Sequence, residues 1–129
     1  MDAAQLLANV ADLHGQPLAN ARGEPGWRCI GLVREALRRS GLDVGESVDT
    51  VTSAQLKAAL KPVKGEPKVG DIGFWNPGGD PDRQNVCGII TGENTMLSVQ
   101  SGQGVAEYPC DTSWHKLHLL GYWRIPQGG

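Results

Sequence analysis

Apolar residues recur every three or four positions in the first part of the chain, which is the spacing of one face of an α-helix. In the segment Asp2–His14 they include Leu6, Val10 and Leu13. The same spacing returns in Cys29–Arg39 and stops at Ser40-Gly41. A third stripe follows the cap-type residues Thr52 and Ser53 and reaches Leu60, before Pro62. We therefore predict three amphipathic helices, over 2–14, 29–39 and 52–60, with a Gly- and Pro-rich loop before the second.

Beyond Pro62 the pattern changes to short apolar runs separated by Gly, Pro, Asn and Asp, which is typical of strands and hairpins. The predicted strands are Val69–Trp75, Val86–Thr91, Met96–Gln100 and Gly121–Ile125. We interpret 78–83 as a hairpin tip, 101–104 as a turn and 113–118 as part of the last connection. Helices followed by a small antiparallel sheet define the α+β class, with the helices packed on one face of the sheet.

The 129 residues are enough for one core, so we expect a single domain over 1–129, with 127–129 as a frayed tail. A hydrophobic share of 40% and a charged share of 20% are those of a globular protein and exclude collagen-like or disordered chains. The net charge of −2, without a basic stripe, argues against nucleic acid as a partner. No apolar run could insert into a membrane and no export signal begins the sequence, so we expect synthesis in the cytoplasm.

The three cysteines, Cys29, Cys87 and Cys110, are odd in number and irregularly spaced, which fits neither a disulfide framework nor a zinc pair. At least one thiol is therefore free, and whether Cys87 and Cys110 pair is left open. Cys110, His115 and His118 are possible metal ligands, but their spacing matches no zinc module. We expect no metal and no cofactor.

Cys29 is the position with the clearest chemistry of its own, because it stands at the start of the second predicted helix. The unpaired N–H groups and the dipole of a helix start stabilise a thiolate, and the neighbouring Arg28 acts in the same direction. The alternative is that Cys29 only packs the helix start as a small apolar residue.

Five blocks of the sequence together resemble the NlpC-type cell-wall peptidases, which are papain-like cysteine hydrolases. In chain order they are His14–Leu18, Trp27–Val33, Thr52–Leu56, Lys68–Trp75 and Gly88–Gly92. The family shows G-x-P-Y, D-C-S-G-L-V, P-G-D-L-V-F-F and H-V-G-I-Y-x-G blocks, and the resemblance extends from about His14 to Ile125. It implies the papain-like NlpC fold, in which a helix carries the nucleophile and a small antiparallel sheet carries its base.

The resemblance makes Cys29 the nucleophile, but the chain departs from the family at the base. The family's histidine falls on Asn85 or Val86, neither of which transfers a proton. The family's third polar position falls near Ser98. Around the cleft, the family's Asp before the cysteine is Arg28, and its aromatic residue after the proline is Leu18; we add Trp27 and Trp75 as candidate binding residues.

These departures indicate a catalytically degenerate NlpC-type module that binds or supports without cleaving. Its expected partners are a peptidoglycan peptide or other protein subunits of an assembly. Because such domains also occur in phage tails, we expect a cell-wall component, a virion or tail-tip component, or a protein of an injection apparatus. The alternative is an active cysteine peptidase or amidase in which His14, His115 or His118 supplies the base.

Overall fold

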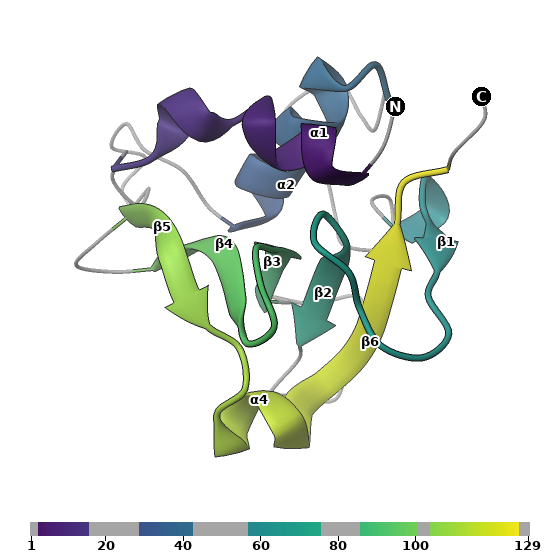
Figure 1. Cartoon of the computed structure of the whole chain (residues 1–129), viewed down its shortest axis with the longest axis vertical. Coiled ribbons are helices and arrows are strands. Elements are labelled where there is room, and N and C mark those ends of the chain that lie inside the picture. Colours follow the sequence, from purple (N-terminus) through teal and green to yellow (C-terminus); the bar gives the residue numbers. More distant parts are fainter. Residues whose placement is uncertain (1–2, 16–28, 43–56, 76–85, 101–103, 127–129) are drawn as a thin grey trace.

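The computed structural model describes residues 3–15, 29–42, 57–75, 86–100 and 104–126. Six strands form one antiparallel sheet in the order β1-β6-β2-β3-β4-β5 (Figure 1). Their bounds are β1 Lys61–Pro62, β2 Ile72–Trp75, β3 Val86–Ile90, β4 Thr95–Gln100, β5 Gly104–Pro109 and β6 Leu119–Arg124. The described helices are α1 Ala3–Ala8, a 3-10 turn Ala11–Leu13, α2 Cys29–Arg39 and α4 Ser113–His118. The predicted α+β class is confirmed.

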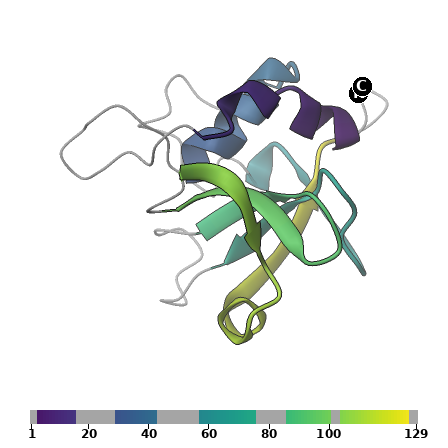
Figure 2. The same ribbon diagram turned by 60° about the vertical axis from the view of Figure 1, so that its left-hand side comes forward.

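Helices α1 and α2 lie together on one face of the sheet, whereas α4 lies at the opposite end of the molecule (Figures 1 and 2). The prediction for α2 is confirmed at both ends, and its apolar stripe of Leu32, Val33, Ala36 and Leu37 is buried against the sheet. Gly41, with φ +91°, follows the helix in the left-handed conformation that glycine adopts most easily.

The first helix is shorter than the segment 2–14 over which the apolar spacing predicted it. It ends at Ala8, and the chain continues into a 3-10 turn that keeps Val10 and Leu13 buried. The third predicted helix, 52–60, lies outside the described residues except for 57–60, of which Leu60 is buried. Apolar periodicity therefore identified the buried faces better than the ends of the helices.

The predicted strands are confirmed in position, with the first beginning later than expected, at Ile72. The last connection, 113–118, contains a helix that the sequence did not predict. These residues form α4, whose start is capped by Thr112, since its side chain accepts a hydrogen bond from the His115 N–H. No α4 residue is buried, and its apolar residues Trp114 and Leu117 are exposed.

The two faces of the sheet support two separate apolar clusters. Toward the helices, Phe74, Cys87, Ile89 and Leu97 belong to the main core. On the other face, Trp75, Ile90 and Met96 form a second cluster, with Val86, Cys110 and Tyr122 packed against it.

Two glycines provide the space for the second cluster. A Cβ at Gly73 would lie 2.4 Å from the Trp75 ring, and one at Gly88 would lie 2.5 Å from the Met96 sulfur. Such distances are far below van der Waals contact, so both strands need glycine where these large side chains cross them.

A buried ion pair joins β2 to β6. Asp71, which is fully buried, accepts hydrogen bonds from Arg124 Nε at 2.7 Å and Arg124 Nη2 at 2.8 Å. Its Oδ2 also accepts from the Lys68 main-chain N–H at 2.7 Å. The Asp of the Val69-Gly70-Asp71-Ile72 block therefore fixes the start of β2 to the end of β6.

Candidate functional site

Helix α2 fixes the position of the candidate nucleophile, because Cys29 is its first residue. The side chain of Cys29 lies outside the described residues. Leu32, Val33 and Leu37 are fully buried, which holds the helix against the sheet. The helix start is thus anchored by packing that begins one turn after Cys29.

A charged network anchors the other end of α2. Glu35 accepts hydrogen bonds from Arg38 at 2.6 and 2.7 Å and from Arg39 at 2.8 Å, and Arg39 also reaches Asp12 at 2.6 Å. The hydrogen bonds from Arg38 lower the pKa of Glu35 to about 2, with a smaller contribution from Arg39 and against the effect of burial. Arg39 thereby ties α2 to the segment that follows α1.

The family's base position corresponds to the first residues of β3. Four consecutive pairs, from Ile72↔Ile89 to Trp75↔Val86, join β2 and β3 without a bulge. Val86 therefore stands two residues before Gly88, as the histidine of the family block stands two before its glycine. This register favours Val86 over Asn85, which lies outside the described residues. The Val86 side chain packs against the Trp75 cluster and offers no group that could exchange a proton.

Ser98, the third candidate position, lies on β4 and is fully buried. Its hydroxyl donates a 2.7 Å hydrogen bond to the Cys87 carbonyl on β3. The hydroxyl is thus used to join two strands. Cys87 itself lies in the main core and is fully buried, which separates its thiol from solvent.

Among the candidate binding residues, the structure describes Trp75 alone. Its ring is fully buried, with edge contacts to His115 and Tyr122 at centroid distances of 5.3 and 6.3 Å. Trp75 therefore belongs to the cluster against which Val86 packs. A direct contact between its ring and a ligand would require the ring to leave this cluster. Its role in binding stays a prediction. Leu18, Trp27 and Arg28 lie outside the described residues.

The three histidines named as alternative bases all lie among the described residues. His14 is exposed. His115 Nδ1 lies 2.6 Å from Thr112 Oγ1, and burial lowers the pKa of this imidazole against the opposing effect of Asp111. His118 Nδ1 lies 2.9 Å from the Trp114 carbonyl oxygen. Both α4 imidazoles thus make local contacts at the end of the molecule opposite α1 and α2 (Figure 1).

Cys110, the remaining cysteine, is also one of the possible metal ligands, together with His115 and His118. No disulfide joins Cys110 to Cys87, which answers the open question of their pairing. Burial, followed by the nearby Asp111, raises the pKa of the Cys110 thiol. Within the described residues, no group of three or more His, Cys, Asp or Glu side chains could hold a metal ion.

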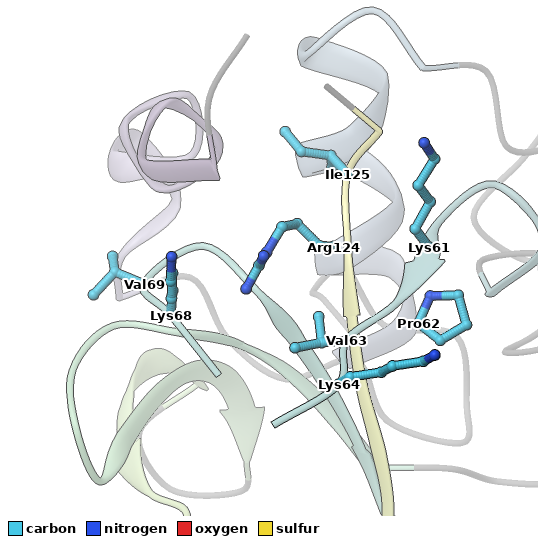
Figure 3. A pocket seen from close by; sticks show the side chains of 8 residues that line it. All are labelled: Lys61, Pro62, Val63, Lys64, Lys68, Val69, Arg124 and Ile125. Atoms are coloured by element: carbon cyan, nitrogen blue, oxygen red, sulfur yellow. The ribbon is translucent and has the colours of Figure 1, made fainter. Parts of the chain in front are cut away.

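The sequence did not predict a basic cavity at the β1 edge of the sheet. Lys61, Lys64 and Lys68 line it together with Arg124 (Figure 3). The spacing of the three lysines was visible in the sequence, but it falls between predicted elements. Only the pairing of β1 with β6 brings Arg124 to them.

Comparison with known proteins gives a consistent answer about the fold. No protein-family model and no curated protein sequence matches the chain. Solved structures do match it, among them an NLP/P60-family protein similar to lipoprotein from Staphylococcus aureus subsp. aureus Mu50 (TM-score 0.67, 15% identity). RipD from Mycobacterium tuberculosis matches with a TM-score of 0.66 and 20% identity. The P60 domain of an antigen from M. avium paratuberculosis matches with a TM-score of 0.68 and 18% identity.

The matches cover 95%, 96% and 96% of this chain, in the same order. The chain spans 41% of the length of the S. aureus protein, but 97% of RipD and 93% of the P60 domain. RipD is described as a non-catalytic NlpC/p60 domain protein adapted to peptidoglycan binding. At these identities the likeness establishes the fold, and the papain-like NlpC/P60 fold expected from the sequence is confirmed. No described helix has the length and apolar character needed to cross a bilayer.

Proposed function

We propose that this chain is a catalytically degenerate NlpC/P60 module that binds peptidoglycan peptides and does not cleave them. The observation that carries the proposal is Val86. Val86 is one of the two positions, with Asn85, to which the resemblance assigns the general base, and its aliphatic side chain packs in a part of the sheet whose register is continuous.

The loss of the base weighs heavily because amide hydrolysis by a thiol needs two proton transfers. The thiol must lose its proton, which the start of α2 could favour, and the departing nitrogen must gain one, which neither Val86 nor an amide side chain supplies. General acid–base assistance is worth roughly 10²–10⁴ in rate, and losing one member of a cooperating set costs more. A scaffold that keeps the fold without this group is better suited to binding than to turnover.

The peptidoglycan ligand is supported by the comparison with RipD. That protein combines the same fold with a non-catalytic character and a peptidoglycan-binding function, and this chain covers 97% of it. The likeness supports a binding role on this scaffold, and the ligand is part of our proposal. Other protein subunits stay an additional class of partner in that proposal, and so does a place in a virion, a tail tip or an injection apparatus. These further assignments rest on the sequence resemblance alone.

Co-sedimentation with purified, insoluble peptidoglycan tests the proposal. We expect the protein to pellet with the polymer in a saturable manner, and Cys29→Ala to pellet equally well because no covalent step is required. Trp27→Ala, at the predicted cleft, is expected to weaken pelleting at least tenfold, whereas Lys116→Ala on α4 serves as the matched control. A protein that stays in the supernatant at every polymer concentration would overturn the proposal.

A further inference from the structure

A cavity of about 610 Å³ opens where β1 joins the edge of the sheet. Its polar lining consists of Lys61, Lys64, Lys68 and Arg124, and the apolar side chains of Val63 and Val69 complete it, with Val63 between Lys64 and Lys68 in the view of Figure 3. The volume lies within the range of cavities that bind small molecules. Of the candidate site residues whose side chains the structure describes, Val86 and Ser98 do not line this cavity.

The cavity concentrates positive charge in a chain whose net charge is −2. Arg124 is balanced by Asp71, to which two of its nitrogens are bonded. No ion pair among the described residues involves the side chains of Lys61, Lys64 or Lys68, and all three are exposed. Glu66 lies in the same connection and is also exposed, so one carboxylate accompanies three ammonium groups.

The pairing of β1 with β6 places Lys61 opposite an arginine that already has its partner. Lys61 is the cross-strand partner of Arg124, whose charge is balanced by Asp71. The ammonium groups of Lys61, Lys64 and Lys68 are therefore the charges that an anion in the cavity would meet.

The edge strand also indicates how a ligand would be recognised. β1 is only two residues long and consists of Lys61 and Pro62. Lysine, proline and a very short edge strand are all features that discourage another strand from adding to a sheet, and Pro62 has no N–H to donate. Recognition at this edge is thus a matter of side-chain charge, not of main-chain pairing.

We propose that this cavity is a binding site for a short acidic peptide whose carboxylates are spaced along an aliphatic framework. Figure 3 shows the ammonium groups of Lys61 and Lys64 on one side of the β6 ribbon and that of Lys68 on the other. Separated cations with apolar walls between them suit several spaced carboxylates better than one compact phosphate group. The site goes beyond the proposed function, since it involves neither Cys29 nor the cleft and stands even if peptidoglycan does not bind there.

The test is an amide-shift NMR titration of the full chain with acetyl-Glu-Glu-Glu, using acetyl-Gln-Gln-Gln-amide as the neutral probe and inorganic pyrophosphate as the phosphate probe. We expect shifts confined to residues around 61–64, 68–69 and 124–125 with the acidic peptide, and none with the neutral one. Raising the ionic strength from about 0.01 M to about 1 M shortens the screening length from about 30 Å to about 3 Å and should abolish the shifts.

The combined variant Lys61→Gln, Lys64→Gln, Lys68→Gln is expected to bind the acidic peptide at least tenfold more weakly, whereas Lys116→Gln should bind it unchanged. Because the three lysines are exposed, the thermal midpoint of the combined variant should stay near that of the parent, which shows that the loss is not unfolding. Equal affinity of the parent and combined variant, shifts elsewhere only, or tighter binding of pyrophosphate than of the acidic peptide would each overturn the proposal. Peptidoglycan co-sedimentation of the combined variant reports separately on the cleft.

Discussion

Val86 stands directly opposite Trp75 in the ladder between β2 and β3, and both side chains belong to the cluster on the face away from α1 and α2. Val86, one of the two positions that the family resemblance offers for a proton carrier, is therefore part of an apolar packing unit. Gly73, which leaves room for the Trp75 ring, belongs to the same unit. A histidine at position 86 would have to fit into this packing.

Replacing Val86 with histidine is expected to destabilise the fold. Val86 is half-buried against the Trp75 cluster, and an imidazole there would bury polar atoms without a partner that the structure identifies, at a cost of at most about 1–3 kcal/mol. Urea unfolding at pH 7.5 measures the effect, with Val86→Ile as the apolar control, for which we expect a change below about 1.5 kcal/mol. If Val86→His were as stable as the parent, packing against the Trp75 cluster would not restrict which residue stands at position 86.

Gly73→Ala is expected to destabilise by about 1–3 kcal/mol, because its Cβ would lie 2.4 Å from the fully buried Trp75 ring. Chemical denaturation measures the loss. In the double variant Gly73→Ala, Trp75→Phe, the smaller ring should relieve part of the clash, so the two changes should cost less together than their sum. Strictly additive costs would show that the glycine does not serve the tryptophan.

The sequence predicts α2 and the four inner strands more completely than the two edge strands, β1 and β5. α2 was found at both ends because its stripe of Leu32, Val33 and Leu37 is local and is followed at once by Ser40-Gly41. β5 was missed because its buried residues Val105 and Tyr108 do not alternate, and its pairing with β4 defines the strand.

The candidate sites also differ in how far the sequence reveals them. Cys29 at a helix start and the loss of the base can be recognised from short motifs. The basic cavity cannot, because Lys61 and Arg124 meet through a pairing of distant strands. The burial of Trp75 was equally hidden from the sequence, since it depends on Gly73 and on which face of β2 is covered by a second cluster.

Stability should depend on acid through Glu35. Its pKa in the folded state, about 2, is below the ordinary value of 4.5, so the folded state favours the charged carboxylate. This contribution is fully present above about pH 5 and is lost as the pH falls from about 4.5 toward 2. Unfolding free energies of the parent and Glu35→Gln across this range test it. The difference between the two proteins should shrink with falling pH, and a constant difference would contradict the assignment.

The three thiols should react with an aromatic disulfide reagent in a defined order at pH 7. Cys29, at a helix start, is expected to react fastest. Cys110 should react more slowly, because burial and Asp111 raise its pKa, and its rate should increase as the pH rises. Cys87, fully buried, should react only on unfolding. The single variants Cys29→Ala and Cys110→Ala assign the phases, and a fast phase that survives Cys29→Ala would remove the case for a thiolate at the start of α2.

The account is tested most directly by the rate at which the protein releases soluble peptides from peptidoglycan, compared with Cys29→Ala under the same conditions. We expect no release above that of the variant over long incubation, even at concentrations at which both proteins are fully bound to the polymer. Release of cleaved peptide that disappears with Cys29→Ala would show that a base reaches this thiol and that the chain is a hydrolase.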